Sequence, residues 1–386
     1  MIVIDYSQTI ISNLMAEIGN RTDVELDVNL LRHMVINTIR SHKVKFGKEY
    51  GEVVIACDSR KYWRKEYFPY YKANRKKSRE DSGFNWPLIF DSINLIKEEL
   101  RAVFPYKVIE IEGAEADDVI FGWSTALNNR GKSCIVWSGD RDLIQLVNYS
   151  KTNDAHTLWY YNTKKSLYVY EGFEEDMKRS IANDMSTDDL LFNMGGEHMT
   201  RDAYQTNILT WIKDLKIEIT EVDCDRFIFN KILMGDKSDN INGIYYLGEK
   251  TLVKLFPELL DKEVNIADIL TKGELLLKED KDNSALKNLL SGRTKDGIFG
   301  DEYYEINKKL VDLSEPLISE EGKELVESYY SESMDPDGRG HKNLIRMMME
   351  DGLFKYLPKN DENWIYFIKP FLKLTRKEKT KFKNKK

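Results

Sequence analysis

Residues 133–146 have the sequence SCIVWSGDRDLIQL, and this stretch indicates the fold of the chain. The apolar run Ser133–Trp137 predicts a buried strand that leads to Asp140. A predicted helix begins at Asp142 and continues to Val147. A buried strand followed at once by a helix is typical of a parallel sheet covered by helices.

Two other predicted strands also end in an acidic residue. Ile2–Ile4 leads to Asp5, and Val53–Cys57 leads to Asp58. In open α/β sheets, ligands bind outside the carboxyl ends of the parallel strands. We therefore expect Asp5, Asp58, Asp140 and Asp142 to gather in one crevice.

The segments between these strands have helical spacing or strand character. Together they predict an α/β fold with a central, mostly parallel sheet flanked by helices. The predicted elements are a helix capped by Asp27 with Val28, Leu31, Val35 and Ile39 on its apolar face, a helix opened by Asn85 and Pro87 that runs to Val103, a strand at Lys107–Ile111 and a helix at Glu115–Asn129.

Further acids occur at a helix start and in a turn. Glu115, Asp117 and Asp118 open the helix after the strand Lys107–Ile111, where acids also suit the helix dipole. Asp236 and Asp239 lie in a turn-rich loop at 235–243, where Asp is also an ordinary turn former. Beside the strand-end acids, metal binding is the preferred interpretation of both groups.

Nine carboxylates in one crevice would repel one another unless cations were present. Ligation by oxygen alone favours Mg²⁺, with Mn²⁺ as a substitute. Two such ions, roughly 3.5–4 Å apart, can hold both oxygens of an in-line phosphoryl displacement. The five histidines have no ligand spacing, so a zinc site is not expected.

Residues 60–80 combine nine Lys or Arg side chains with six aromatic ones. One interpretation is an amphipathic helix with its aromatic residues in the core. The alternative is a nucleic-acid-binding element, in which bases stack on aromatic rings and cations meet phosphates. On the second interpretation, Lys72 and Arg75 would contact the scissile phosphate. The other expected contacts are Arg60, Lys61, Arg64, Lys65, Tyr71, Lys76 and Lys77.

Three spaced motifs resemble the flap endonuclease or 5′-nuclease superfamily. They are Glu115-Ala116-Asp117-Asp118, the block Ser138–Leu146 and Gly235-Asp236-Lys237-Ser238-Asp239-Asn240-Ile241. The segments Tyr62-Trp63-Arg64-Lys65 and Tyr70-Tyr71-Lys72-Ala73-Asn74-Arg75 resemble the ribonucleases H of T-even bacteriophages within it. The resemblance covers roughly residues 1–165 and 225–256.

The resemblance implies a role for each matched residue. One metal ion would be held by Asp5, Asp58, Asp117 and Asp140, assisted by Glu115 and Asp118. A second would be held by Asp142, Asp236 and Asp239. Lys72 would be the active-site lysine and Arg75 the phosphate-binding arginine, and residues 60–85 would form a helical arch that admits single strands.

The segment 241–256 resembles the helix–turn–helix element that binds the duplex backbone in this family. Gly243, Gly248 and Lys250 would contact the duplex, and a K⁺ ion would lie near 241–248. Tyr245 and Tyr246 occupy positions where the family has small turn residues.

The 386 residues are accordingly divided into several parts. Residues 1–165 and 225–240 would form the metal-dependent nuclease core, and 166–222 would be an insertion of unassigned role. Residues 240–366 would be a helical C-terminal region, and 367–386 a basic tail. The net charge of −7 is uneven, since residues 369–386 hold nine Lys or Arg against one Glu.

Composition limits the compartment. No apolar run approaches the ~20 residues of a membrane span, and the start Met1-Ile2-Val3-Ile4-Asp5 has no signal-peptide pattern. Three widely spaced cysteines favour reduced thiols in a cytoplasm, that of the host cell if a phage encodes the chain.

The expected function is that of a Mg²⁺-dependent, structure-specific 5′ nuclease, with 5′→3′ exonuclease, flap endonuclease and ribonuclease H activity. It would act as a monomer on branched or 5′-ended DNA and RNA·DNA duplexes, and would remove RNA primers during phage lagging-strand replication. A single-strand-binding protein or a sliding clamp would be its replisome partner. Two alternatives remain: an inactive branched-DNA-binding protein, and a haloacid-dehalogenase-type phosphatase, which would need a second Asp where Ser7 stands.

Overall fold

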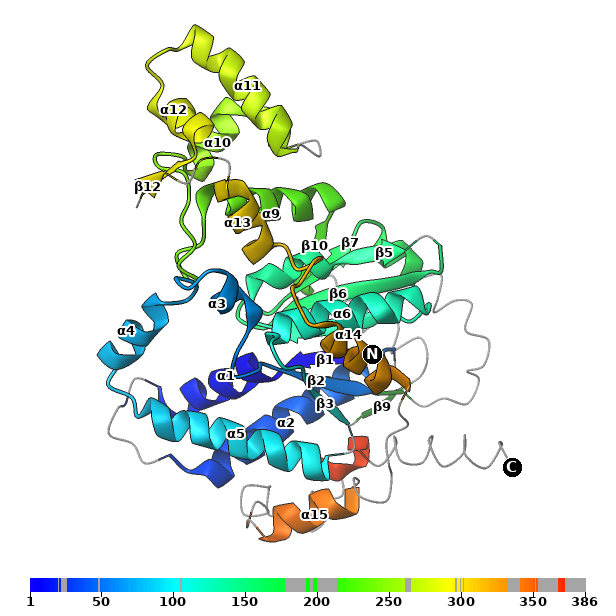
Figure 1. The fold of residues 1–386 in the computed structure, drawn as a ribbon. Helices are drawn as coiled ribbons and strands as arrows, with labels where there is room; N and C mark the ends of the chain where they lie inside the picture. Colours follow the sequence, from blue (N-terminus) through cyan, green and yellow to red (C-terminus); the bar gives the residue numbers. More distant parts are fainter. Residues whose placement is uncertain are drawn as a thin grey trace.

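A single eight-stranded sheet forms the centre of the molecule, with the strand order β10-β7-β6-β4-β1-β2-β3 and β5 paired to β6 (Figure 1). The structure is a computed structural model. It describes residues 1–19, 21, 26–47, 49–104, 106–150, 152–177, 192–194, 197–199, 214–260, 265–295, 297–298, 300, 302–331, 341–350, 352 and 367–371.

The middle of the sheet is parallel, as the sequence predicted. It contains β1 (Ile2–Asp5), β2 (Val53–Cys57), β3 (Lys107–Glu110) and β4 (Cys134–Ser138). β1 pairs in parallel with both β2 and β4, and β2 pairs in parallel with β3. The carboxyl ends of these strands therefore meet at one edge, where the acids were expected.

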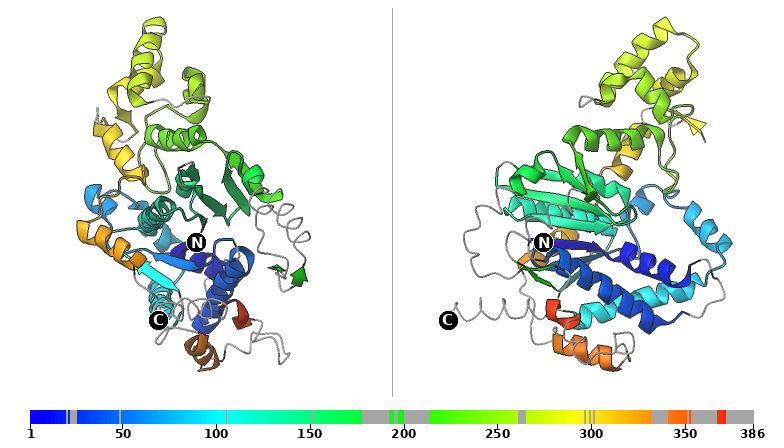
Figure 2. Two further views of the ribbon diagram at one scale, coloured as in Figure 1. Left: turned by 90° about the vertical axis from the view of Figure 1, so that its right-hand side faces the viewer. Right: turned by 180° about the vertical axis from the view of Figure 1, so that it is seen from behind.

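Helices cover both faces of this sheet, because β1 and β2 are buried along their whole length. α1 (Tyr6–Ile18) and α2 (Val28–Phe46) lie on one face, and α6 (Ala116–Asn129) lies on the other (Figures 1 and 2). The predicted Asp27 cap is present, since its side chain accepts from the amides of Asn29 and Leu30. Asn85 likewise caps α5 (Trp86–Val103).

Two elements near the site were missed by the sequence interpretation. α1 begins directly after β1, with Asp5 as its cap. β6 (Ala155–Tyr161) pairs with β4 and extends the sheet beyond the expected strands. The helix expected at Asp142–Val147 is a 3₁₀ helix, η1 (Arg141–Leu146).

Both ends of the expected insertion at 166–222 belong to the central sheet. β7 (Ser166–Tyr170) pairs with β6, and β10 (Lys216–Ile219) pairs with β7. β5 (Asn148–Ser150), which precedes β6 in the chain, also pairs with β6. Between them, β8 (Phe192–Met194) and β9 (Glu197–Met199) form a hairpin. Residues 178–191, 195–196 and 200–213 of the expected insertion lie outside the described residues.

A second group of helices has its own core above the sheet (Figure 1). Leu233, Leu252, Phe256 and Leu289 are buried there. The elements are α9 (Glu221–Met234), α10 (Glu249–Leu255), η2 (Pro257–Leu260), α11 (Ile266–Glu279), α12 (Ser284–Ser291), β11 (Arg293–Thr294), β12 (Gly297–Ile298) and α13 (Glu302–Val311).

After α13 the chain returns to the first core. α14 (Glu320–Ser331) packs beside α6, and α15 (His341–Glu350) places Leu344 and Met348 in the core of the sheet domain. Phe367, Ile368 and Phe371 join them, whereas the rest of the predicted basic tail lies outside the described residues. Among the described helices, none combines the length and the hydropathy that crossing a membrane requires.

Candidate metal centre

Three acids lie at the shared carboxyl edge of β1, β2 and β4. Asp5 is the last residue of β1, Asp58 follows β2, and Asp140 follows β4 by two residues. The parallel register sets Asp5 beside Ala56 of β2, and Ile4 beside Trp137 of β4. The fold thus brings together side chains separated by 135 positions in the sequence.

Local hydrogen bonds orient two of these carboxylates. Asp5 accepts from the Gln8 amide at 3.1 Å and from Ser138 Oγ at 2.7 Å. Asp58 accepts from Ser7 Oγ at 2.5 Å and from the Ala116 amide at 2.8 Å. These donors fix each side chain without supplying a full positive charge.

Crowding raises the pKa of the acids at this edge. Burial, followed by the charge of Asp58, raises the pKa of Asp5 to about 7, although the Ser138 hydrogen bond opposes the shift. Burial, followed by the charges of Asp140 and Asp5, raises the pKa of Asp117 well above its ordinary value. Asp117 enters from the first turn of α6. Asp5, Asp58, Asp117 and Asp140 therefore form one electrostatically coupled group, called cluster 1 below.

Asp142, Asp236 and Asp239 form a second group, called cluster 2 below. Their nearest carboxylate oxygens lie within 4.8 Å of one another. Asp142 comes from η1, whereas Asp236 and Asp239 come from the loop after α9. Hydrogen bonds in both directions between the Asp236 and Ile241 backbones close this loop.

Gly243 is required where this loop passes α9. A Cβ atom on Gly243 would lie 1.8 Å from the carbonyl oxygen of Met234. The chain can therefore pass only without a side chain at this position. The need for glycine here arises from the loop that carries Asp236 and Asp239.

Lys231 contacts cluster 2 and was not expected from the sequence. Its ammonium pairs with Asp142 and lies 2.5 Å from Asp236. Burial would lower its pKa, but the charges of Asp142 and Asp236 prevail and raise it to about 12. Burial also raises the pKa of Asp142 to about 6, even though Lys231 acts in the opposite direction. No sequence signal separates Lys231 from the other lysines of the chain.

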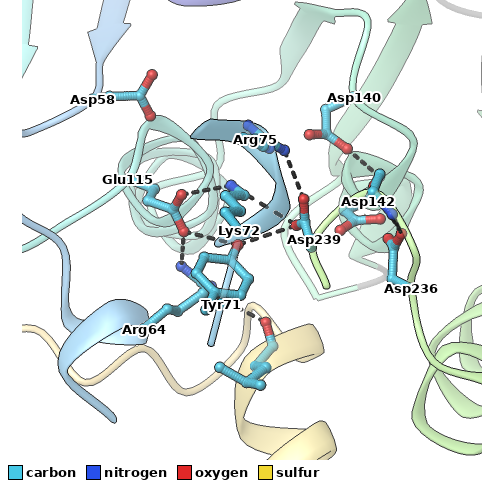
Figure 3. Close-up of polar contacts among 12 residues, drawn as sticks. Asp58, Arg64, Tyr71, Lys72, Arg75, Glu115, Asp140, Asp142, Asp236 and Asp239 are labelled. Carbon is cyan, nitrogen blue, oxygen red and sulfur yellow. Dashed lines mark hydrogen bonds and ion pairs between the residues drawn. The ribbon is translucent and has the colours of Figure 1, made fainter. Parts of the chain in front are cut away.

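Lys72 lies between α3 (Trp63–Tyr67) and α4 (Asn74–Asp81), and Arg75 lies in α4. Both contact Asp239 of cluster 2, and Lys72 also contacts Glu115, which is near Asp117 of cluster 1. Figure 3 shows Lys72 between Glu115 and Asp239, with Nζ 2.6 Å from Glu115 Oε1 and 3.8 Å from Asp239 Oδ2. Arg75 lies 2.6 Å from Asp239. The Lys72 backbone has φ +55°, and its amide donates to the Asp239 carbonyl at 2.8 Å.

Lys72 stays charged in these surroundings. Burial would lower the pKa of its ammonium group, but Tyr71, Glu115 and Asp239 more than offset that effect. The pKa is therefore well above its ordinary value. Lys72 supplies a fixed positive charge next to the carboxylates.

The donor set of both clusters fits divalent cations. Every ligand candidate is a carboxylate, and carboxylate oxygens are common ligands of divalent cations. The raised pKa values of Asp5, Asp117 and Asp142 show that the fold confines negative charge that bound cations would stabilise. A divalent metal centre is thus consistent with this geometry.

Residues 3–178 match the family model of the 5′-3′ exonuclease N-terminal, resolvase-like domain. These residues form a 5′-3′ exonuclease domain. The predicted membership of the 5′-nuclease superfamily is confirmed, as is the predicted class of metal-dependent enzyme that hydrolyses phosphodiester bonds.

Similar proteins include a ribonuclease H and a DNA polymerase I. The ribonuclease H of Enterobacteria phage T4 is 29% identical over 251 residues, which are 60% of this chain and 79% of that protein. DNA polymerase I of Bacillus caldotenax is 28% identical over 264 residues, 67% of this chain. The match spans only 24% of the polymerase. Among solved structures, the T5 5′-exonuclease with bound divalent metal ions (zinc) is 18% identical, with a TM-score of 0.49, over 81% of this chain and 89% of that one.

Two expected nucleic-acid contacts, Arg64 and Tyr71, have other partners in the exonuclease domain. Arg64 was expected to bind nucleic acid, but its guanidinium is 2% exposed and pairs with Glu115 and Asp118. Tyr71 was expected to do the same, but it is buried, and its hydroxyl contacts Glu115 and Asp239 at 3.1 and 3.2 Å. Both expectations are corrected, because a buried side chain cannot meet a strand at the surface.

Asp118 is also used differently from the expectation of metal binding. Its carboxylate pairs with Arg64 at 2.8 Å and accepts from the Glu115 amide at 2.9 Å, as part of the capping box of α6. Trp63 Nε1 donates to the same group at 3.2 Å. These partners make Asp118 a structural acid.

The remaining expected contacts lie at the surface or close to it. Gly243 is half-buried against Met234. Exposed residues from the expected set are Arg60, Lys61, Lys65, Arg75, Lys76, Lys77, Gly248 and Lys250.

Proposed function

We propose that this chain is a Mg²⁺-dependent, structure-specific 5′ nuclease that cleaves 5′-ended or branched DNA and RNA·DNA duplexes by a two-metal mechanism. One observation carries the proposal. Clusters 1 and 2 lie at the same sheet edge, where Lys72 and Arg75 of the basic segment contact Asp239 of cluster 2 and Lys72 also contacts Glu115 beside cluster 1.

Each cluster would hold one cation. Asp5, Asp58, Asp117 and Asp140 would hold the first, with Glu115 beside them. Asp142, Asp236 and Asp239 would hold the second, and Lys231 would compete with it for Asp142 and Asp236. When bound, such cations supply an activated water and stabilise charge on both oxygens of the displacement.

The chain's own residues would orient the phosphodiester. Lys72 and Arg75 keep two cationic groups beside Glu115 and Asp239, and these groups can stabilise charge that develops on a phosphate there. α4 carries the exposed basic side chains of Lys76 and Lys77, and none of its residues is buried. Residues 60–85 would accordingly guide a single strand towards the clusters.

Similar proteins suggest the substrate and the setting. The names of the phage T4 relative and of a phage T5 structure specify a ribonuclease H and a flap endonuclease. By analogy, this chain would remove RNA primers during phage lagging-strand replication in the host cytoplasm. It would act as a monomer with a single-strand-binding protein or a sliding clamp.

Different segments of the chain would have different roles. Residues 1–165 and 225–240 would form the nuclease core, and 241–256 would bind duplex through Gly243, Gly248 and Lys250, with a K⁺ ion near 241–248. Gly248 is exposed and is the N-cap of α10.

The test compares the wild-type chain with Asp140→Asn. We expect the wild type to cleave end-labelled 5′ flaps and RNA·DNA hybrids with Mg²⁺, and to stop with EDTA. Asp140→Asn should reduce cleavage by at least about a thousandfold, because it removes one charge from cluster 1. Its affinity for flap DNA should stay within about tenfold of the wild type.

Other results would support the alternatives. Tight flap binding without any Mg²⁺-dependent cleavage would identify an inactive DNA-binding protein. Hydrolysis of small phosphate esters without nuclease activity would identify a phosphatase. Full cleavage by Asp140→Asn would remove cluster 1 from the mechanism.

A further inference from the structure

The end of α9 is held by α13, which packs beside it (Figure 1). The last carbonyl groups of a helix have no partner within the helix. Two of these groups in α9, those of Ile232 and Leu233, meet the hydroxyl of Tyr303 at 2.5 and 2.8 Å. Tyr303 is a buried residue of α13. α13 therefore fixes the point at which the chain leaves α9 for the loop of Asp236 and Asp239.

Asn307 of α13 joins the two sides of this loop at its base. Its Nδ2 donates to the carbonyl oxygen of Ile232, before the loop, and to that of Asn242, near the end of the loop, both at 2.9 Å. A side-chain amide nitrogen has two hydrogens, so Asn307 can serve both acceptors at once. The side chain is buried, and buried acceptors left without a donor are costly. Asn307 thus fixes the base of the loop that carries Asp236 and Asp239.

The carboxyl end of α13 holds the other source of cluster 2. Gln145 belongs to η1, the element that supplies Asp142. Its Nε2 donates to the Val311 carbonyl at 3.0 Å, and its Oε1 accepts from the Leu313 amide at 3.2 Å. Both polar atoms of Gln145 are thus bound to the backbone at the end of α13.

An apolar contact lies between these two sets of hydrogen bonds. Ile241 of the loop is buried in one small cluster with Tyr71 and with Leu310 and Val311 of α13. Apolar burial stabilises the contact but is not directional. The hydrogen bonds of Asn307 and Gln145 therefore define where the loop and η1 lie relative to α13.

We propose that α13 sets the geometry of the second cation site, with Asn307 and Gln145 as positioning residues. Cluster 2 draws its three carboxylates from η1 and from the loop at 235–243, and both are hydrogen-bonded to this one helix. A metal site needs ligands held at fixed separations by the groups around them. This inference rests on the proposed function and names the residues that position its second cation.

The test measures Mn²⁺ binding to the full chain without nucleic acid, by electron paramagnetic resonance of the free ion. Asp236→Asn identifies the binding step that belongs to cluster 2. Asn307→Ala should weaken that step about tenfold, the lower end of the effect of outer-shell partners, and should leave the other step within about twofold. Gln145→Ala should have the same effect, because it releases η1 from α13.

Asn288→Ala is the matched control. Asn288 is also a buried asparagine, and its Nδ2 donates to a backbone carbonyl outside the loop, that of Tyr245. This control should bind Mn²⁺ in both steps as the wild type does. An equal loss at the cluster 2 step in Asn307→Ala and Asn288→Ala would overturn the proposal, because a general loss of stability would then explain the effect.

A milder pair of variants removes one hydroxyl each from α13. Tyr303 and Tyr304 are both buried, but Tyr304 donates to the Leu289 carbonyl of α12 instead of to α9. Tyr303→Phe should weaken the cluster 2 step about threefold, as expected for one lost hydrogen bond, and Tyr304→Phe should not change it. If Asn307→Ala does not fold, this pair decides: a weaker step in Tyr303→Phe alone supports the proposal, and equal Mn²⁺ binding overturns it.

Flap cleavage gives a second readout that a structural role would not produce. In Asn307→Ala the Mg²⁺ concentration for half-maximal rate should rise about tenfold, while the rate at saturating Mg²⁺ stays within about threefold of the wild type. A lower saturating rate with an unchanged Mg²⁺ midpoint would overturn the proposal.

The two proposals fail in distinguishable ways. A wild-type chain that binds Mn²⁺ in a step sensitive to Asp236→Asn, yet never cleaves flaps, removes the proposed function, while the Mn²⁺ comparisons still decide the role of α13. A wild-type chain that cleaves flaps, with Asn307→Ala and Asn288→Ala equal in Mn²⁺ binding, removes only the role of α13. A wild-type chain without any step sensitive to Asp236→Asn removes the second cation site and the role of α13 together.

Discussion

Single acidic residues at one sheet edge have different electrostatic roles. Asp118 is neutralised by Arg64, and Asp236 by Lys231 and by donors from Ser238, so that the pKa of Asp236 is lowered despite burial. Among the described residues no cation pairs with Asp5, and burial with the nearby charge of Asp58 raises its pKa to about 7. Acids of the second kind are those whose charge a bound metal ion would stabilise.

The raised pKa of Asp5 predicts how stability depends on pH without metal. The folded chain binds a proton on Asp5 that the unfolded chain has already lost above its ordinary pKa of 3.8. The melting temperature in EDTA should therefore fall as pH rises from about 5 to about 8, through the folded pKa. Mg²⁺ should raise the melting temperature most at the upper end, because it binds the ionised carboxylates.

The check is differential scanning fluorimetry of the wild type and Asp5→Asn, each with EDTA and with Mg²⁺. Asp5→Asn should have a flatter pH profile in EDTA and a smaller gain from Mg²⁺. A wild-type profile that rises over this interval would contradict the predicted sign.

At the scale of elements, α4 is unusual because it has no buried residue. A helix of eight residues without a packed face gains little stability from the core. The exposed charges of Lys76 and Lys77 are therefore available for binding, unlike that of Arg64 in α3, which lies in the core.

We predict that Lys76→Ala/Lys77→Ala changes binding and leaves stability unaltered. Both side chains are exposed, so the free energy of unfolding should change by less than about 0.5 kcal/mol per substitution. The slope of log Kd against log salt for a 5′ overhang should fall by about two, because two phosphate contacts are lost. Lys278→Ala/Lys281→Ala is the control, and an equal slope in both double variants would exclude α4 from the substrate path.

Across the whole molecule, Arg64 connects three distant parts. Its guanidinium pairs with Glu115 and Asp118 of the sheet domain, and Nε donates to the Leu310 carbonyl in α13 at 3.0 Å. Arg64 itself belongs to α3 at the base of the basic segment. One buried cation thus holds the basic segment 60–80, the start of α6 and the helical C-terminal region together.

Arg64→Met should destabilise the folded chain by about 3–5 kcal/mol, because it leaves the buried Asp118 without its cation and removes one of the two cations that pair with Glu115. Adding Asp118→Asn should recover part of the loss, since the two residues interact directly. Urea denaturation followed by circular dichroism measures both effects. Arg101→Met is the control, because it breaks more exposed pairs with Glu98 and Glu110, and it should lower the free energy of unfolding by at most about 1 kcal/mol. Equal losses of unfolding free energy in Arg64→Met and Arg101→Met would contradict the role of Arg64.

The sequence by itself determined the parallel strands, their terminal acids and the family. These features are local, because a buried strand, a capping residue such as Asp27 and an acid at a strand end are each visible within a few positions. The carboxyl ends of parallel strands then have to meet at one edge. The sheet order, the extra strand β6 and the return of α14 to α6 involve contacts between distant positions, so no short pattern predicts them.

Only the tertiary structure decided which charged residues are partners. Arg64 and Lys65 are neighbours in a basic run, yet one is buried among acids and the other is exposed. Lys231 resembles every other lysine until the loop at 235–243 brings Asp236 beside it. The physical reason is that the energy of a charge depends on its burial and on the charges within a few ångströms, and these are set by the packing of distant elements.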